Sequence, residues 1–345
     1  MKKITTLITL LAMYLFVSAQ DMKDMNGTKK DSTRKTLPMS NKMLAIAGLV
    51  PPGIMVGQKG KWMIGYQGMF DKMRDNLDGD NAVSNQKILQ NFMATPTDML
   101  MQMHMARVMY SLTNKLSLML MLPYTQKSMN HITQTGETFT ERTNGIGDIE
   151  LRGLYSLYAG KEQRQQLLLN FGVGIPTGSV NKLMGKMRLE YPMQLGSGTV
   201  SVIPGFIYFC TTASWGWGAE FMPKLQLGTN RNGYRLGNSY EPSFWLTRKV
   251  TPRLSVSANA NAKLWSNIIG VDAELDKMDE PTKDRLLQGG NRLDLTLGAN
   301  IHPTSKFFNG QQFFVHISKP VLQSLNGPQL QNRYIMKFGW QLEIN

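Results

Sequence analysis

The chain has 345 residues, with 38 Lys and Arg against 24 Asp and Glu, so its formal net charge is +14. Cys210 is its single cysteine, which excludes an intramolecular disulfide framework. After the N-terminus no stretch approaches the ~18 consecutive apolar residues that a membrane-spanning helix needs, which excludes a helical membrane bundle. The basic residues are spread along a chain that we expect to be exported, so we expect no nucleic-acid partner.

The N-terminus has the pattern of a secretory signal peptide. Lys2 and Lys3 precede an apolar run over residues 4–17, and the small residues Ser18 and Ala19 follow it. A basic start, a short apolar run and small residues at its end predict that residues 1–19 are a signal peptide, with a retained membrane anchor as the alternative. Residues 20–44 are basic and contain Gly, Ser, Thr and Pro, so we expect a disordered basic leader.

From residue 61 to the C-terminus, apolar and polar residues alternate with a period of two. Examples are NRLDLTLGANI at 291–301 and YIMKFGWQLEI at 334–344. One face of each segment is apolar, and the other carries charges, amides and glycines. These two examples are eleven residues long, whereas the usual strand has about five or six residues. Long alternating segments of this kind are typical of a transmembrane β-barrel. A soluble β-sandwich is the alternative, with shorter strands and a polar face toward water.

The spacing of these segments supports the barrel independently. We count twelve of them, and the connections between them alternate in length. The long connections are 71–97, 125–144, 176–197, 228–238, 267–290 and 320–332. Outer-membrane barrels have short periplasmic turns, long external loops and an even number of strands. We therefore predict an all-β fold over residues 61–345, an antiparallel up-and-down transmembrane β-barrel of about 12 strands in the outer membrane of a Gram-negative cell.

The segment before the barrel differs from both of its neighbours. Residues 45–60, AIAGLVPPGIMVGQKG, are apolar and rich in Pro and Gly. A barrel of this size has a narrow lumen that side chains and inserted segments can fill. We predict that residues 45–60 enter or cap the periplasmic mouth of the barrel as a plug.

Several motifs together resemble a known family. ATPTDMLMQMHMARVMY is followed by GIGDIELRGLYSLY and LNFGVGIPTGS, and the resemblance extends over about residues 52–342. They resemble the phenol-degradation (meta-pathway) type outer-membrane transporter family, and more narrowly its methionine-rich branch associated with copper and silver resistance. The resemblance implies an outer-membrane barrel related to channels for hydrophobic compounds, with a connection to metal. Members of that branch often carry histidines before the first strand, and PPGIMVGQKGKWM here has none, which weakens the metal interpretation.

Residues 99–122 contain seven methionines and one histidine. Residues two apart on a strand share a face, so Met99, Met101, Met103, Met105 and Met109 lie on one face with Arg107. His104 lies on the other face, which excludes a metal site made by the MHM tripeptide on a regular strand.

The next strand indicates which face is the lumen. Residues 116, 118, 120 and 122 are all leucine, the better face for lipid, which places Met119 and Met121 inside. An arginine facing lipid at the midplane would cost about 2–4 kcal/mol, which also favours an inward Arg107. Methionines face inward on both strands only if Met109 lies opposite Met119 and Arg107 opposite Met121. Met63 and Met69 would extend this surface onto the first strand.

Two interpretations of the methionines remain open. Thioether sulfur is a soft ligand suited to Cu(I) and Ag(I). Methionine is also a pliable apolar residue that suits the wall of a path for hydrophobic solutes. Twelve of the 25 methionines fall between Met63 and Met129, and this concentration favours a role beyond filling space. The candidate soft-metal ligands are Met99, Met101, Met103, Met105, Met109, Met119 and Met121.

Charged residues on the inward faces of the predicted strands need partners because the lumen is narrow. We expect a polar lumen network made by Arg107, Asp148, Glu150, Arg152, Glu220, Lys224, Lys263, Asp294, Lys337 and Glu343. His131, beside Met129 in a predicted external loop, is expected to be solvated. We find no set of residues with catalytic spacing, so we predict no catalytic residues and no bound cofactor other than transient Cu(I) or Ag(I).

The sequence thus predicts a barrel that passively transports or binds a small solute. Soft metal ions are the first candidate solute, and small hydrophobic or aromatic compounds are the alternative. An outer-membrane enzyme and a structural barrel rank lower. The expected partners are outer-membrane lipid and lipopolysaccharide, the barrel-assembly machinery, and a small-molecule or metal-ion solute.

Overall fold

The computed structural model describes residues 49–51, 54, 57–160, 164–303 and 310–344. The predicted signal peptide, the predicted leader and the start of the predicted plug therefore lie outside the described residues. All of the described residues belong to one compact unit within residues 42–345. None of the helices within these ranges is long and apolar enough to cross a membrane.

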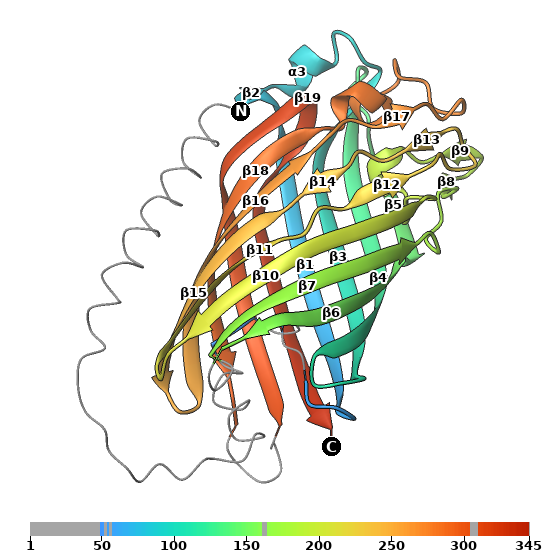
Figure 1. Ribbon diagram of the computed structural model, residues 1–345. Coiled ribbons are helices and arrows are strands. Elements are labelled where there is room, and N and C mark those ends of the chain that lie inside the picture. The colour runs from blue at the N-terminus through green and yellow to red at the C-terminus, as the bar shows by residue number, and fades with distance from the viewer. Residues whose placement is uncertain (1–48, 52–53, 55–56, 161–163, 304–309, 345) are drawn as a thin grey trace, which may run out of the picture. The chain divides into compact units, whose positions relative to one another are not determined.

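The alternating region forms a closed antiparallel β-barrel (Figure 1). Its strands are β1 (Trp62–Gly79), β3 (Ala94–Ser111), β4 (Leu116–Thr133), β6 (Ile149–Ala159), β7 (Gln165–Ile175), β10 (Val200–Thr211), β11 (Trp215–Phe221), β15 (Pro242–Thr251), β16 (Leu254–Trp265), β18 (Gly290–Ile301) and β19 (Gln311–Ile344). These strands are hydrogen-bonded in the order β11-β15-β16-β18-β19-β1-β3-β4-β6-β7-β10, and pairing of β10 with β11 closes the ring. The predicted all-β barrel is confirmed.

Strand β19 crosses the wall twice. Its first half pairs with β18 and its second half with β1. The two halves lie side by side, because Gln341 Nε2 donates to Gln312 Oε1 at 2.6 Å. Between them Gly327 has a φ of +96°, a conformation that glycine adopts without steric cost. The eleven strands of the described barrel therefore make twelve passes, in agreement with the number of alternating segments.

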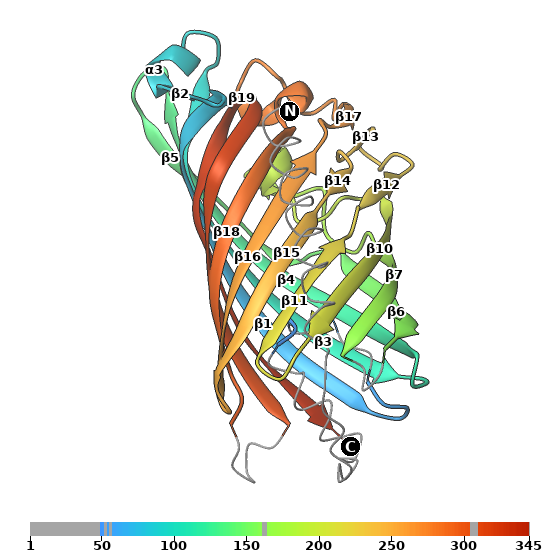
Figure 2. The same ribbon diagram turned by 60° about the vertical axis from the view of Figure 1, so that its left-hand side comes forward.

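The two ends of the barrel differ in the way the sequence predicts (Figure 2). One end, called here the loop end, carries the long connections and their short elements. These elements are β2 (Asn81–Val83), α3 (Asn85–Ile88), β5 (Thr138–Ile146), β8 (Leu183–Met184), β9 (Met187–Arg188), η2 (Tyr191–Met193), β12 (Leu225–Leu227), β13 (Tyr234–Arg235), β14 (Ser239–Tyr240), β17 (Ile269–Gly270), η3 (Pro281–Lys283) and η4 (Arg285–Leu287). The opposite end, called the turn end, has short connections such as residues 112–115.

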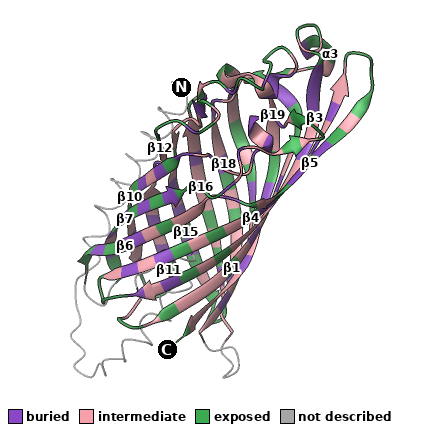
Figure 3. Ribbon diagram, turned by 90° about the vertical axis from the view of Figure 1, so that its right-hand side faces the viewer, coloured by how far each residue is buried: buried purple, intermediate pink, exposed green. Residues whose placement is uncertain are grey.

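Three of the predicted loops are largely strand, which corrects the sequence interpretation. β1 and β3 take up much of 71–97, β4 and β5 form a hairpin within 125–144, and β19 continues through 320–332. In Figure 3 this β4–β5 hairpin extends beyond the barrel wall. Strand pairing continues past the apolar band of the barrel, where a strand no longer needs an apolar outer face, so the hydrophobic alternation fades before the strand ends.

The outer face carries a continuous apolar band. Val108, Leu120 and Leu151 lie next to one another in the registers of β3, β4 and β6. Leu120 is 46% exposed and Leu151 is 45% exposed, although both are apolar. Exposed residues alternate with more buried ones along the strands, as Figure 3 shows, and many of the exposed ones are apolar. The leucine face of β4 thus lies outside, as predicted.

Two apolar clusters lie inside the barrel toward its two ends, and a third, of Tyr191, Tyr234, Ile268 and Leu275, lies among the loop-end connections. The turn-end cluster contains Val50, Ile54, Met109, Met119, Leu154, Leu168, Ile207, Phe209 and Trp245. The loop-end cluster contains Met99, Met129, Leu189 and Met193. Val50 and Ile54 belong to the predicted plug, and Lys59 N donates to Asn114 Oδ1 in the turn between β3 and β4 at 2.9 Å. The described residues of this segment therefore pack at the turn end, and the role of residues 45–60 as a plug stays a prediction.

Candidate functional site: a methionine-lined cavity in the lumen

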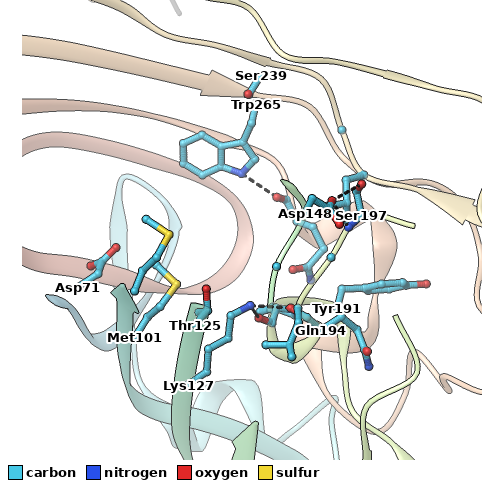
Figure 4. Close-up of a pocket in the computed structure, with 18 of the residues that line it drawn as sticks. Asp71, Met101, Thr125, Lys127, Asp148, Tyr191, Gln194, Ser197, Ser239 and Trp265 are labelled. Carbon is cyan, nitrogen blue, oxygen red and sulfur yellow. Dashed lines mark hydrogen bonds between the residues drawn. The ribbon is translucent and has the colours of Figure 1, made fainter. Parts of the chain in front are cut away.

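A cavity of about 740 Å³ lies inside the barrel. This volume is within the range of sites that hold small organic molecules. Seven methionines line it: Met73, Met99, Met101, Met103, Met105, Met121 and Met129. They come from β1, β3 and β4, and much of the remaining wall is polar or charged. The cavity therefore has a methionine-rich wall, in which Asp71 and Lys127 lie opposite Met101, and a more polar side formed by other strands and loops (Figure 4).

The register predicted for the β3–β4 hairpin is confirmed. Met109 lies opposite Met119, and Arg107 lies opposite Met121. The neighbouring β1 adds Met63 opposite Met109 and Met73 opposite Met99. Since Met99 also lies opposite Met129, two rows of three methionines cross three strands. These rows are Met63–Met109–Met119 and Met73–Met99–Met129.

The seven predicted methionines do not all face the same space. Met99, Met101, Met103, Met105 and Met121 line the large cavity. Met109 and Met119 lie deeper, toward the turn end, where they border a much smaller void together with Arg107. His104 is on the outer side, as its position in the alternation predicts, and its Nδ1 lies 2.6 Å from the Tyr66 hydroxyl. Five of the seven candidate soft-metal ligands thus line the cavity.

On the polar side, Glu150 is the centre of one charged group. It accepts hydrogen bonds from Arg152 Nη2 at 2.7 Å and from Lys224 Nζ at 2.9 Å. All three residues line the cavity. Glu220 lies outside the cavity lining, where it accepts from Ser243 Oγ at 3.2 Å.

A second charged group spans β1, β16, β18 and β19. Arg292 Nε lies 2.9 Å from Asp294 Oδ1, and Lys263 Nζ lies 2.9 Å from Glu241 Oε1. Asp71 accepts from Asn332 Nδ2 at 2.6 Å. Lys337 interacts with this group through its charge.

The remaining predicted network residues have other neighbours. Asp148 accepts from the backbone of Gly178 and Ser197, so it holds the loop between β7 and β10. Glu343 pairs with Lys61 at 3.3 Å near the turn end. The structure therefore places the predicted residues in several hydrogen-bonded groups, and Glu220 interacts through its charge with Arg152 of the first group and Lys337 of the second.

The sequence reasoning missed several charged lining residues. Lys127 donates to the carbonyl oxygens of Pro192 and Gln194, both at 2.6 Å, and so ties β4 to the loop after β7 (Figure 4). Asp71 and Arg292 also line the cavity. Asp71 and Lys127 fall in segments predicted as loops, although the period-two pattern that includes Met69 and Met73 continues through Asp71 and could have revealed it.

Comparison with known proteins agrees with this architecture. Residues 97–267 match the family model described as "Putative MetA-pathway of phenol degradation". The match covers just under half of the chain and includes the methionine-rich strands β3 and β4. It supports the family resemblance seen in the sequence, whereas the copper and silver branch stays a prediction. No curated protein sequence matches the chain.

Among solved structures, the fold is similar to that of the COG4313 outer membrane channel from Pseudomonas putida F1. The TM-score is 0.61 at 13% sequence identity, over 86% of this chain and 100% of that one. The translocator domain of the autotransporter NalP from Neisseria meningitidis aligns at a TM-score of 0.45 and 10% identity, over 88% and 94% of the two chains. The P. putida toluene transporter TodX aligns at 0.41 and 11%, over 88% and 92%. The first of these likenesses shows that the chain has the fold of an outer-membrane barrel.

Proposed function

We propose that the chain is an outer-membrane channel for small hydrophobic or aromatic solutes. The observation that carries this proposal is the cavity of about 740 Å³ that seven methionines line together with charged groups. Outer-membrane lipid and lipopolysaccharide would surround the apolar band, and the barrel-assembly machinery would insert the chain. The structural likeness to an outer membrane channel and the match to a phenol-degradation family support a transport function.

The lining suggests which solutes fit best. Methionine side chains adapt to apolar surfaces and make favourable contacts with aromatic rings. The charged lining residues are Lys127, Arg152, Lys224, Lys263 and Arg292 against Asp71, Asp148 and Glu150. Lys263 and Arg292 are paired with Glu241 and Asp294, so these charges balance. A solute with an aromatic body and a polar group, such as a hydroxyl or a carboxylate, can contact both the methionines and the charged groups. Passage of a solute through the whole barrel would require the turn-end cluster and the loop-end cluster to move.

We do not propose an enzyme. A hydrolase would need a serine, a histidine and an acid within hydrogen-bond reach of one another. His104 is bonded to Tyr66, and His131 faces two glutamates. Neither of these two arrangements joins a histidine to a serine.

Replacement of two cavity methionines tests the channel proposal. Met103→Gln with Met105→Gln is expected to weaken binding of benzoate to the detergent-solubilised barrel by about tenfold, because two apolar contacts are lost at about 0.5–1 kcal/mol each. Isothermal titration calorimetry would give the affinity, and uptake into proteoliposomes would give the flux. Met187→Gln is the matched control, since Met187 is 65% exposed in the loop between β7 and β10. Equal benzoate binding by wild type and the double variant would contradict the proposal.

Soft-metal transport is a second candidate, favoured by the two rows of three methionines. Neighbouring strands are about 4.8 Å apart, so the flexible thioethers of one row can approach a single ion. A barrel with Met63, Met73, Met99, Met101, Met109 and Met119 all changed to Leu leaves neither row complete. It is expected to lose saturable Ag(I) binding in calorimetric titration. Weak and equal Ag(I) binding by wild type and this variant would leave the methionines as an apolar wall.

A further inference from the structure

A second set of ligand-type side chains lies at the loop end, apart from the methionines. His131 belongs to β4 and Glu141 to β5, while Glu190 directly precedes η2 and Glu280 directly precedes η3. His131 Nε2 lies 3.2 Å from Glu280 Oε2 and 3.7 Å from Glu190 Oε1. One ligand atom from each of these three residues lies within 4.8 Å of the others. Three segments far apart in the sequence thus meet at one imidazole.

Local structure holds this imidazole in place. His131 lies opposite Phe139 in the β4–β5 register, and the two rings stack with centroids 4.8 Å apart and planes 9° apart. Met129 lies opposite Glu141, so Glu141 is a diagonal neighbour of His131 on the same face. The hairpin therefore presents an imidazole and a carboxylate together toward the loops that carry Glu190 and Glu280.

The cluster is buried but poorly satisfied. His131 is 1% exposed and Glu190 is 0% exposed. Although His131 Nε2 lies 3.2 Å from Glu280 Oε2, within the described ranges neither ring nitrogen of His131 and neither carboxylate oxygen of Glu190 makes a hydrogen bond of good geometry. Glu141 Oε2 is also buried and accepts no hydrogen bond from the described residues. Burial of polar and charged groups without partners lowers the stability of the fold. A positive group bound among these carboxylates would remove this cost.

The nearby basic side chains have other partners. Lys127 interacts with Glu190 through its charge, but its ammonium donates to the carbonyl oxygens of Pro192 and Gln194. Lys283 interacts with Glu280, but its ammonium donates to Asp279 at 2.9 Å. Neither lysine occupies the space between the imidazole and the carboxylates.

We infer that His131, Glu190 and Glu280, assisted by Glu141, bind a divalent cation of the Zn²⁺ class. Imidazole with carboxylates is a donor set that Zn²⁺ accepts. Ligands bound at 2.0–2.2 Å in a tetrahedron lie about 3.3–3.6 Å from each other, and the distances of 3.2 Å and 3.7 Å here are close to that range. The ion would join the β4–β5 hairpin to the η2 and η3 segments at the loop end. It would be a structural ion that stabilises the loop end. Its ligands include none of the methionines or charged groups that we assign to solute binding.

A shared proton is the competing explanation for the adjacent carboxylates. Burial, followed by the neighbouring carboxylate of Glu141, raises the pKa of Glu190 well above its usual range. Burial alone would also raise the pKa of Glu280, but His131 and Lys283 outweigh it and lower that pKa. A proton between Glu190 and Glu141 would stabilise the loop end without any metal.

The experiment uses the full chain in detergent micelles after treatment with EDTA and dialysis. Calorimetric titration with Zn²⁺ is expected to show one ion per chain and a higher Tm. Glu190→Gln and His131→Gln are expected to bind Zn²⁺ at least about tenfold more weakly. Glu137→Gln, a change at an exposed residue in the turn of the same hairpin, should bind like wild type. Co²⁺ would give visible absorption bands in wild type that Glu190→Gln lacks.

Either of two results would overturn the inference. One is a wild-type chain that shows neither saturable Zn²⁺ binding nor a rise in Tm. The other is a Glu190→Gln chain that binds Zn²⁺ as well as wild type. The shared proton predicts the first result, together with a Glu190→Gln chain at least as stable as wild type. Zn²⁺ binding by the barrel that lacks six methionines would separate this site from soft-metal binding in the lumen.

Discussion

Leu120→Arg is expected to lower the free energy of unfolding of the barrel in lipid by about 2–4 kcal/mol, because the guanidinium would face the hydrocarbon core. Leu120 lies within the apolar band and is 46% exposed on the outer face. Its cross-strand neighbours, Val108 and Leu151, are apolar and exposed as well, so no partner on that face could compensate for the charge. Equilibrium urea unfolding in lipid vesicles, followed by tryptophan fluorescence, would measure the change.

Leu183→Arg is the matched control for this prediction. Leu183 is 51% exposed in the connection between β7 and β10 at the loop end, where an arginine side chain reaches water. The expected loss there is about 0–1 kcal/mol. Similar losses at both positions would show that the leucine face of β4 does not contact lipid hydrocarbon.

Glu150→Gln is expected to lower the free energy of unfolding by about 2–3 kcal/mol. Glu150 accepts two hydrogen bonds from Arg152 and one from Lys224. Without its charge, two cations that are only partly exposed would lie in the lumen with no carboxylate between them. This loss of stability is smaller than for a fully buried ion pair, because the charged group borders a cavity that admits water. Denaturant unfolding under the same conditions would measure it.

The double variant Glu150→Gln with Lys224→Gln separates the loss of an ion pair from a change in packing. It is expected to recover part of the lost stability, since one of the two unpaired cations is removed. The Lys224→Gln single variant completes the comparison. If the double variant loses as much stability as the two single variants together, Glu150 and Lys224 act independently.

The candidate site was only partly predictable, and particular residues show why. Met109 opposite Met119 followed from parity, because one strand must place its leucines toward lipid and its methionines inward. Lys127 and Asp71 were assigned to loops because the apolar alternation weakens there, although strand pairing continues through both. Asp148 was predicted to join other charged groups, whereas it accepts from the backbone of the loop after β7.

His131 shows the limit most clearly. Its sequence neighbours, Asn130 and Ile132, do not include a ligand, and a single histidine in a predicted loop is expected to be solvated. In the fold it is buried against Glu190 and Glu280, which lie 59 and 149 residues away along the chain.

The sequence by itself determined the barrel, its number of passes, the inward methionine face and the β3–β4 register. Each of these depends on a local period of two and on the requirement that lipid contacts apolar side chains. Only the tertiary structure decided which lumen charges pair with one another and that a cavity lies beside the methionines. It alone brought the imidazole and carboxylates together at the loop end. These features depend on the paths of long loops across the barrel, and contacts between distant segments leave no period in the sequence.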